Sequence, residues 1–183
     1  PTKDLRLMSA KISDYLYDLA NYLPHNIEDL LAEIINLLQS ALRNNTQLVL
    51  IGNGGSYSSA EHWATDLSLL GFNTKIISPG ILTALANDFG YQHSFAKILG
   101  LHNELLIAFS VSGWSGNILL AGSKISQSIL FTSKNYNPAA KFNIIIPIQS
   151  TDFGIVENIH LAIGHFIRKE LEIWMKTVGP TSR

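Results

Sequence analysis

The sequence predicts an α/β fold of three layers, in which helices cover both faces of a doubly wound, mainly parallel sheet of five strands. Two observations predict this class. From residue 46 onward, short apolar runs alternate with stretches of helical periodicity, which is the pattern of a parallel sheet. Polar loops that contain glycine directly follow two of these runs, as they do where ligands bind beyond the carboxyl ends of parallel strands.

The first 45 residues predict two helices that precede the sheet, separated at Pro24. The second apolar stripe is wide for a helix with one side in water, so we expect both helices to pack on a partner subunit as well as on their own domain. A stripe that serves only the internal core is the alternative. The apolar residues that recur at steps of three and four are Leu5, Met8, Ile12, Tyr15, Leu16, Leu19 and Leu23, then Ile27, Leu30, Leu31, Ile34, Ile35, Leu38 and Leu42.

Five short apolar runs predict the strands, with helices expected at residues 60–70 and 152–175. No repeat or linker interrupts the chain, so we expect one domain over residues 1–183. Residues 1–45 would serve oligomerisation and residues 46–178 would form the core. The predicted strands are QLVLIG (47–52), NTKIIS (73–78), ELLIAFS (104–110), SQSILFTS (126–133) and KFNIIIPI (141–148).

The composition excludes several classes of protein. Thirteen Lys and Arg against 14 Asp and Glu give a formal charge of −1, which provides no basic field for nucleic acid. The lack of Cys rules out a disulfide scaffold, a thiolate metal site and a Cys nucleophile. No apolar run reaches the roughly 18 residues of a membrane span, and no secretory signal is visible, so we expect a cytoplasmic protein with no membrane partner. Only 15% of residues are charged, which favours burial of apolar surface between subunits.

The first polar loop is Gly52–Asn53–Gly54–Gly55–Ser56, directly after the strand at residues 47–52. Glycine lets the backbone approach a ligand, and the start of the next helix offers unpaired N–H groups that favour an anion. The loop matches neither the dinucleotide fingerprint nor the P-loop. A tight strand-to-helix turn without a ligand is the alternative.

The second polar loop is Ser110–Val111–Ser112–Gly113–Trp114–Ser115, directly after the strand at residues 104–110. Three hydroxyls around a glycine suit the oxygens of a phosphate, although such clusters are also common in turns. Neither loop contains Lys or Arg. Together the loops predict a phosphate that is held by hydroxyl groups and helix dipoles rather than by charge.

Two pairs of side chains predict a metal site. His62 and Asp66 are four residues apart on one predicted helix, and Glu157 and His165 are eight apart on another, so each pair shares a helix face. Two imidazoles and two carboxylates can hold Zn²⁺. Ordinary surface pairs are the alternative. His160 lies five residues before His165, about 140° around the helix, so we expect it to face elsewhere.

Three motifs in this order resemble the sugar-isomerase (SIS) domain, in its phosphoheptose isomerase branch. They are GNGGSYSSAEH (52–62), LTALANDFGY (82–91) and SVSGWS (110–115). The resemblance covers about residues 5 to 175. It implies a sugar-phosphate site built between the subunits of a homotetramer, or at least a dimer.

The resemblance also implies roles for individual residues. Asp66 would be the base and His165 the acid, and Zn²⁺, which some members of the family bind, would be held by His62, Asp66, Glu157 and His165. The phosphate and sugar would be bound by Asn53, Gly54, Ser56, Ser110, Ser112 and Ser115, with Asp88 and Asp152 as further polar contacts. Asp88 could instead be a turn residue before Gly90, and Asp152 only the N-cap of the last helix.

The sequence departs from the family pattern around this site. Asp66 stands where the family has Glu, and Glu157 where it has Gln. In the second loop, Val111 replaces Thr and Trp114 replaces Asn, and at the start of the last helix Ile155 replaces Arg. Asp is one methylene shorter than Glu, and Glu157 adds a negative charge near an anionic substrate.

The function that the resemblance implies is aldose–ketose isomerisation of sedoheptulose 7-phosphate, on a path to surface heptose. The alternative is a non-catalytic tetrameric SIS protein that binds a phosphosugar or a partner protein. The change to Asp66 favours this alternative, whereas the retained His62 and His165 favour the isomerase. A sugar-phosphate-sensing regulatory domain is a third reading, disfavoured because we find no DNA-binding module in the sequence.

Overall fold

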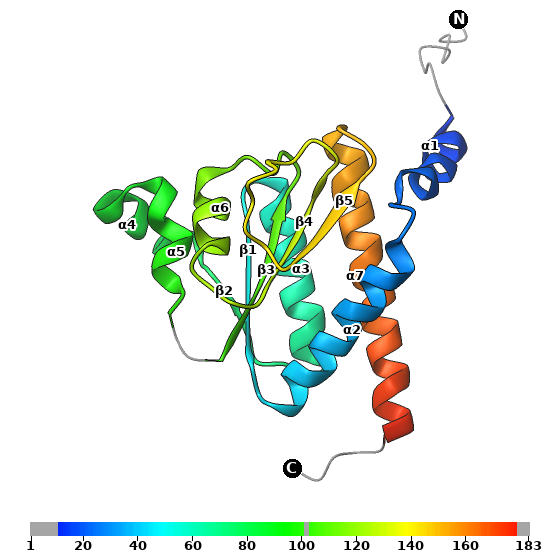
Figure 1. Ribbon diagram of the computed structural model, residues 1–183, viewed down its shortest axis with the longest axis horizontal. Coiled ribbons are helices and arrows are strands. Elements are labelled where there is room, and N and C mark those ends of the chain that lie inside the picture. Colours follow the sequence, from blue (N-terminus) through cyan, green and yellow to red (C-terminus); the bar gives the residue numbers. More distant parts are fainter. Residues whose placement is uncertain (1–10, 101–102, 179–183) are drawn as a thin grey trace, which may run out of the picture.

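The computed structural model describes residues 11–100 and 103–178, which form three layers (Figure 1). Five strands make one sheet in the order β2-β1-β3-β4-β5, and every neighbouring pair is parallel. The predicted α/β class is therefore confirmed, with a sheet that is parallel throughout. The strands are β1 (Gln47–Gly52), β2 (Thr74–Ile76), β3 (Glu104–Ser110), β4 (Ser128–Ser133) and β5 (Ile144–Ile148).

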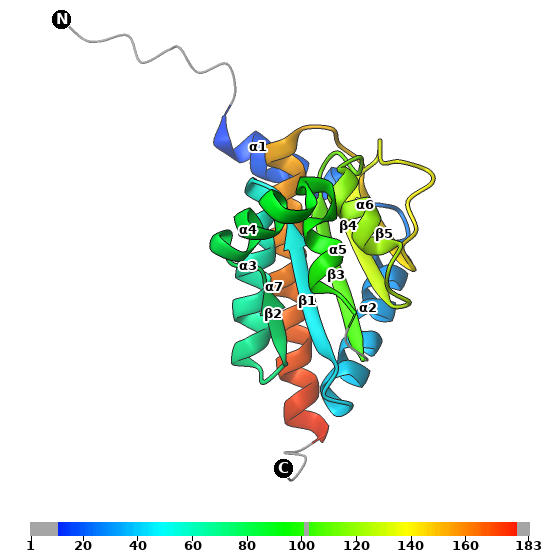
Figure 2. The same ribbon diagram turned by 90° about the vertical axis from the view of Figure 1, so that its left-hand side faces the viewer.

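Helices cover both faces of this sheet. The helices α2, α3 and α7 pack on one face, and α4, α5 and α6 lie on the other, which faces the viewer in Figure 2. Among the described residues, no helix is long and apolar enough to cross a membrane. The helices are α1 (Ile12–Asp18), η1 (Leu19–Tyr22), α2 (Ile27–Arg43), α3 (Gly55–Leu69), α4 (Pro79–Phe89), η2 (Tyr91–His93), α5 (Ser94–Ile98), α6 (Gly116–Gly122) and α7 (Phe153–Val178).

The central strands are buried on both faces, as in other parallel sheets. Alternate side chains enter different cores: Leu48 and Leu50 of β1 face α2, α3 and α7, whereas Val49 and Ile51 face the opposite layer. All seven residues of β3 are buried. This explains why the strands appear in the sequence as continuous apolar runs rather than as alternating patterns.

The region between β2 and β3 differs most from the sequence prediction, which placed no element there. The structure has α4, η2 and α5 in this stretch. Pro79 and Gly80 look like helix breakers, but Ser78 caps α4 by accepting a hydrogen bond from Ile81 N, and proline is favoured in a first turn. Helix α3 likewise begins at Gly55, five residues before the predicted start, because Ser56 and Ser59 are buried polar residues that hide its periodicity.

The two N-terminal helices have different environments. The stripe of α2 serves the internal core through Ile27, Leu31, Ile34, Leu38 and Ala41, which are buried. Helix α1 buries none of its residues. The stripe residues Leu5 and Met8 lie outside the described part of the chain. Packing of both helices on a partner subunit stays a prediction. Helix α1 leaves more apolar surface exposed for such packing than α2 does.

An aromatic cluster joins α3 to α7 beneath the sheet. Trp63 of α3 meets the rings of Phe109 and Phe131 edge-on, with centroids 5.3 and 4.9 Å away, and its Nε1 donates to the carbonyl oxygen of His160 on α7 over 3.1 Å. At Gly164 of α7, a Cβ would lie 2.3 Å from Trp63 Nε1. Because Trp63 is held on three sides, α7 approaches α3 this closely only with glycine at position 164.

Replacement of Gly164 by Ala should therefore destabilise the protein, although Ala is the better helix former. We expect a loss of about 1–3 kcal/mol in the free energy of unfolding, the usual cost of overpacking a core. Urea unfolding measures this loss. As a matched control, Gly80→Ala in α4, where a Cβ meets nothing within 4 Å, should be neutral or stabilising by up to about 1 kcal/mol. Equal stability of the Gly164→Ala variant and the wild type would contradict the packing argument.

Candidate functional site

The two polar loops lie side by side at the carboxyl edge of the sheet. β1 and β3 are neighbours, with Gly52 opposite Phe109, so the loops at residues 52–56 and 110–115 leave adjacent strands. The strand order reverses here, because the chain proceeds from β1 outward to β2 and then returns to β3. Such a switch point is where open parallel sheets bind ligands.

The glycines of the first loop are required by its geometry. Gly54 has φ 56° and ψ −125°, a conformation in the left-handed region that side chains other than glycine rarely adopt. A Cβ at Gly52 would lie 2.4 Å from the carbonyl oxygen of Ser56. The turn therefore passes directly into the first turn of α3, and it places Ser56, which is 5% exposed, close to the carboxyl end of β1.

A pair of side-chain amides joins the first loop to α6, the helix that follows the second loop. Asn53 Nδ2 donates to Asn117 Oδ1 and Asn117 Nδ2 donates to Asn53 Oδ1, each over 3.0 Å. Tyr91 Oη also donates to Asn53 Oδ1 over 2.6 Å, so the segment after α4 is joined to the same point. Asn117 and Tyr91 were not among the predicted site residues. An amide in the first turn after the second loop was the available signal for Asn117.

The second loop uses its hydroxyl oxygens to hold its own backbone. Ser110 Oγ accepts from Gly113 N and Ser112 Oγ accepts from Trp114 N, both over 3.2 Å. Since these serines accept, their O–H groups can donate to an anion. Ser115 is the residue that precedes α6. Trp114 is 58% exposed, and its Nε1 donates to the carbonyl oxygen of Asn135 over 2.8 Å, which fixes the indole beside the loop.

The structure places the two predicted aspartates at helix ends. Asp152 caps α7, because its Oδ1 accepts from Ile155 N over 2.9 Å, as the N-cap interpretation expected. Asp88 is exposed near the end of α4, and its Oδ1 accepts from Asn87 Nδ2. Tyr91 rather than Asp88 makes the hydrogen bond that joins this segment to Asn53. A contact of either aspartate with a sugar stays a prediction.

Three of the four predicted metal ligands form one group. His62, Asp66 and His165 each present a ligand atom within 4.8 Å of the others, on the facing sides of α3 and α7. The Nε2 atoms of His62 and His165 are 2.9 Å apart, and His62 Nε2 lies 3.5 Å from Asp66 Oδ2. Two nitrogens bound to one tetrahedral Zn²⁺ are about 3.3 Å apart. The three residues therefore fit a zinc ion with small side-chain movements.

Glu157, the fourth predicted ligand, does not belong to this group of mutually close ligand atoms. Its Oε1 accepts from Ser56 Oγ over 3.4 Å, and a Cβ at Gly55 would lie 2.5 and 2.6 Å from its two carboxylate oxygens. The carboxylate is thus packed on the first residues of α3. The physical reason is its position on α7, about two turns before His165, which places it beside the beginning of α3 rather than beside His62.

Arg168 is a further member of the histidine group that sequence reasoning missed. Its Nη1 contacts Asp66 Oδ1 at 2.5 Å, and its Nε contacts Glu172 Oε1 at 3.0 Å. The hydrogen bond that Arg168 donates to Glu172 and the charge of Asp66 raise the pKa of the Arg168 guanidinium, which stays charged. Asp66 thus has one oxygen on Arg168 and the other directed at His62. Arg168 follows His165 by three residues and so lies on the same face of the helix, which is the sequence signal that could have identified it.

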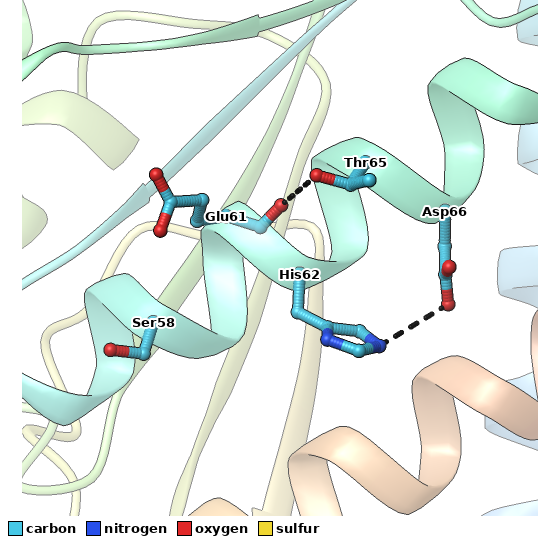
Figure 3. A pocket seen from close by; sticks show the side chains of 5 residues that line it. All are labelled: Ser58, Glu61, His62, Thr65 and Asp66. Carbon is cyan, nitrogen blue, oxygen red and sulfur yellow. Dashed lines mark hydrogen bonds and ion pairs between the residues drawn. The ribbon is translucent and has the colours of Figure 1, made fainter.

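A pocket of about 390 Å³ opens beside this group (Figure 3). His62 and Asp66 point from α3 toward α7, with their ion pair between them. All five residues that line the pocket belong to α3, so in this chain the pocket has a wall on one side only. They are Ser58, Glu61, His62, Thr65 and Asp66.

His160 faces away from the site, as the sequence predicted. It is fully buried against Phe109 and Phe131, and the backbone of Thr132 is the polar group beside its ring. Burial lowers the pKa of His160 from 6.5 to about 3, because the apolar surroundings disfavour the charged imidazolium. It is a neutral core residue in the native protein.

Several curated proteins that are similar to this chain are phosphoheptose isomerases. No family model matches the chain. A phosphoheptose isomerase of Helicobacter pylori strain 26695 is 31% identical over 162 residues, which cover 77% of this chain and 82% of the relative. A phosphoheptose isomerase of Thermodesulfovibrio yellowstonii is 28% identical over 162 residues, covering 78% and 79% of the two chains.

Solved structures support the same fold. Phosphoheptose isomerase GmhA from Neisseria gonorrhoeae superimposes with a TM-score of 0.76 at 20% identity, covering 88% of this chain and 96% of that one. A phosphoheptose isomerase from Francisella tularensis gives a TM-score of 0.71 at 23% identity, covering 86% and 94%. At these identities the superpositions establish the fold, and the sequence relatives carry the family.

The buried His160 should make the protein sensitive to acid. Its pKa is lower in the folded state than in the unfolded state, so its contribution to stability is complete above pH 6.5 and is lost as the pH falls from 6.5 toward 3. At pH 5 the loss is about 2 kcal/mol. In His160→Leu, the fall in the free energy of unfolding between pH 7 and pH 5 should be smaller by about that amount, as measured by urea titration.

The matched control is His25→Leu, because His25 is exposed. This variant should lose as much stability on acidification as the wild type. If His160→Leu and the wild type respond identically to pH, His160 is not the residue that the acid protonates.

Proposed function

The chain belongs to the phosphoheptose isomerase family, and from that premise we propose that it is an aldose–ketose isomerase that interconverts sedoheptulose 7-phosphate and a heptose 7-phosphate in heptose biosynthesis. The observation that carries this proposal is the group of His62, Asp66 and His165, within 4.8 Å of one another beside an open pocket. Two imidazoles and a carboxylate provide acid, base and electrophilic stabilisation in one place. The reaction belongs in the cytoplasm, because a charged sugar phosphate does not cross apolar bilayers unaided.

The phosphate is assigned to the two polar loops. The hydroxyl groups of Ser56, Ser110, Ser112 and Ser115 and the backbone at Asn53 and Gly54 surround the carboxyl ends of β1 and β3. Hydroxyl donors and the start of α3 favour an anion without a cationic side chain. Among the residues nearer the sugar, Asp152 Oδ1 caps α7, so Oδ2 is the oxygen that we assign to a sugar hydroxyl, and Asp88 stays a second such acceptor.

The proposed chemistry moves a proton between C1 and C2. Starting from the ketose, Asp66 removes a proton from C1, the electrons pass to the carbonyl oxygen of C2, and His165 donates a proton to this oxygen. Return of the first proton from Asp66 to C2 and transfer of the C1 hydroxyl proton to His165, which restores its proton, then complete the aldose. Arg168 holds Asp66 Oδ1, which leaves Oδ2 as the basic oxygen. Zn²⁺, if held by His62, Asp66 and His165, would supply Lewis-acid stabilisation of the developing negative charge in place of the proton from His165.

A specific observation supports the second candidate function, a non-catalytic protein that binds a phosphosugar or a partner protein. The ion pair with Arg168 ties the carboxylate of Asp66 in place, and this side chain is one methylene shorter than the Glu of the family. A carboxylate that is both shorter and fixed reaches the substrate less easily, and an error of about 1 Å can lower a rate 100-fold. The two candidates therefore differ in turnover and not in phosphosugar binding.

The assembly that we propose is a homotetramer. Large apolar side chains lie exposed on α1 and at the start of α7: Ile12 is 67%, Leu16 58%, Tyr17 77% and Phe153 61% exposed. Asn158 Nδ2 of α7 donates to Tyr15 Oη over 2.9 Å, which places the two elements together (Figure 1). We call Ile12, Leu16, Tyr17 and Phe153 the N-terminal apolar patch. Patches of this kind mark protein interfaces, and a neighbouring subunit would supply the missing wall of the pocket.

Turnover separates the two candidate functions. With sedoheptulose 7-phosphate in deuterated water, the purified protein should exchange the C1–C2 proton and form the aldose, measured by NMR with and without added zinc. Asp66→Asn and His165→Ala should each lower the rate at least 100-fold, because each removes a proton-transfer group.

The same variants should keep the oligomeric mass and the melting temperature of the wild type within a few degrees, which separates lost chemistry from lost structure. Arg168→Gln is the graded control, with a loss in kcat smaller than that of Asp66→Asn. Phosphosugar binding by the wild type without any exchange at high protein concentration would favour the non-catalytic candidate.

The N-terminal apolar patch should hold the subunits together. Light scattering of the wild type should give the mass of a tetramer, and Leu16→Glu should shift it toward smaller species, because a charge buried at an interface is costly. Unchanged circular dichroism would show that the variant is still folded. A monomeric wild type at micromolar concentration would rule out the proposed assembly.

A further inference from the structure

The carboxylate of Glu157 lies at the place where the proposed function needs an anion to bind. Both of its oxygens are within 2.6 Å of the position that a Cβ on Gly55 would take, and Ser56 Oγ donates to one of them over 3.4 Å. Gly55 and Ser56 are the first two residues of α3. Since the glycine has no side chain, the carboxylate rests directly on the backbone of the first turn.

The start of α3 stabilises a negative charge at this place. The first N–H groups of a helix have no partner within the helix, and the helix dipole adds a partial positive charge there. The residue before the helix, Gly54, provides no side-chain cap. Glu157 therefore places a negative charge beside this helix start, from another helix.

The charge of Glu157 is not neutralised by a basic side chain. Over residues 11–100 and 103–178 it takes part in no ion pair, and neither polar loop contains Lys or Arg. A dianionic phosphate near Ser56 would thus meet an unpaired carboxylate. At separations of a few ångströms, such like charges repel by several times the thermal energy unless one of them moves away.

We propose that Glu157 sets the affinity of the phosphate site, because its carboxylate competes with the phosphate of the substrate for Ser56 and the first turn of α3. This inference rests on the proposed function, because it takes the phosphate site from it. Binding of a phosphosugar displaces the carboxylate, and the contacts of the sugar provide the free energy for this displacement. Inorganic phosphate lacks those contacts, so with the carboxylate in place it binds too weakly to fill the site, whereas a phosphorylated sugar still binds.

The experiment measures inorganic phosphate binding by isothermal titration calorimetry to the wild type, Glu157→Gln and Glu157→Ala. Gln keeps the shape and the hydrogen bond to Ser56 but removes the charge, and Ala removes both. We expect both variants to bind inorganic phosphate at least tenfold more tightly than the wild type. The affinity for sedoheptulose 7-phosphate should increase by a similar factor, because the same displacement of the carboxylate is removed for both ligands.

The matched control is Glu170→Gln, which makes the same charge change on the same helix. Thirteen residues separate the two positions, about 20 Å along α7, which is more than the screening length at physiological salt. This variant should bind phosphate as the wild type does. In the absence of phosphate, Glu157→Gln should also melt a few degrees lower than Glu170→Gln, because it removes the charge at the start of α3.

Phosphate affinities that agree within twofold among the wild type, Glu157→Gln and Glu170→Gln would overturn the inference. Failure of phosphate to bind to either Glu157 variant would overturn it too. Neither result decides the proposed function, which the turnover of sedoheptulose 7-phosphate by the wild type tests separately.

Discussion

The packing of α7 against α3 is the interaction on which the rest of the site depends. Both helices begin at the carboxyl edge of the same parallel sheet, so they run in the same direction. Residues further along α3 therefore contact residues further along α7. Ser56 meets Glu157, His62 meets His165, and Asp66 meets Arg168, at separations of 101, 103 and 102 residues in the sequence. A shift of one helix by a single turn, about 5.4 Å, would break all three contacts.

The aromatic cluster sets this register. Trp63 is held by the rings of Phe109 and Phe131 and by its hydrogen bond to the carbonyl oxygen of His160, and Gly164 leaves room for its indole. The cluster lies in the same turns of α3 and α7 as the histidine pair. Because packed interiors tolerate little change of volume, the polar groups are positioned by an apolar contact directly behind them.

Much of the fold could be predicted from the sequence, whereas the polar contacts could not. The five strands and the terminal helix appear as apolar runs and periodic stripes, which are local signals. Helix α4 was missed because Pro79 and Gly80 resemble breakers, although Ser78 caps the helix that follows. The motif residues of the two loops were found, but Asn117, Tyr91 and Arg168 were not, since each acts on a residue 38 or more positions away.

By itself, the sequence determined the layer architecture, the two hydroxyl-rich loops and three of the metal-type ligands, because residue periodicity and motif spacing are properties of neighbouring positions. The tertiary structure alone decided which partners these residues have. On α7, Glu157 and His165 lie two turns apart and both face α3, so the sequence grouped them, yet one meets the start of α3 and the other meets His62. The position of each residue along α7 therefore decides whether it lies beside the start of α3, as Glu157 does, or beside His62, as His165 does. Only the packing of α3 on α7 sets those positions relative to one another.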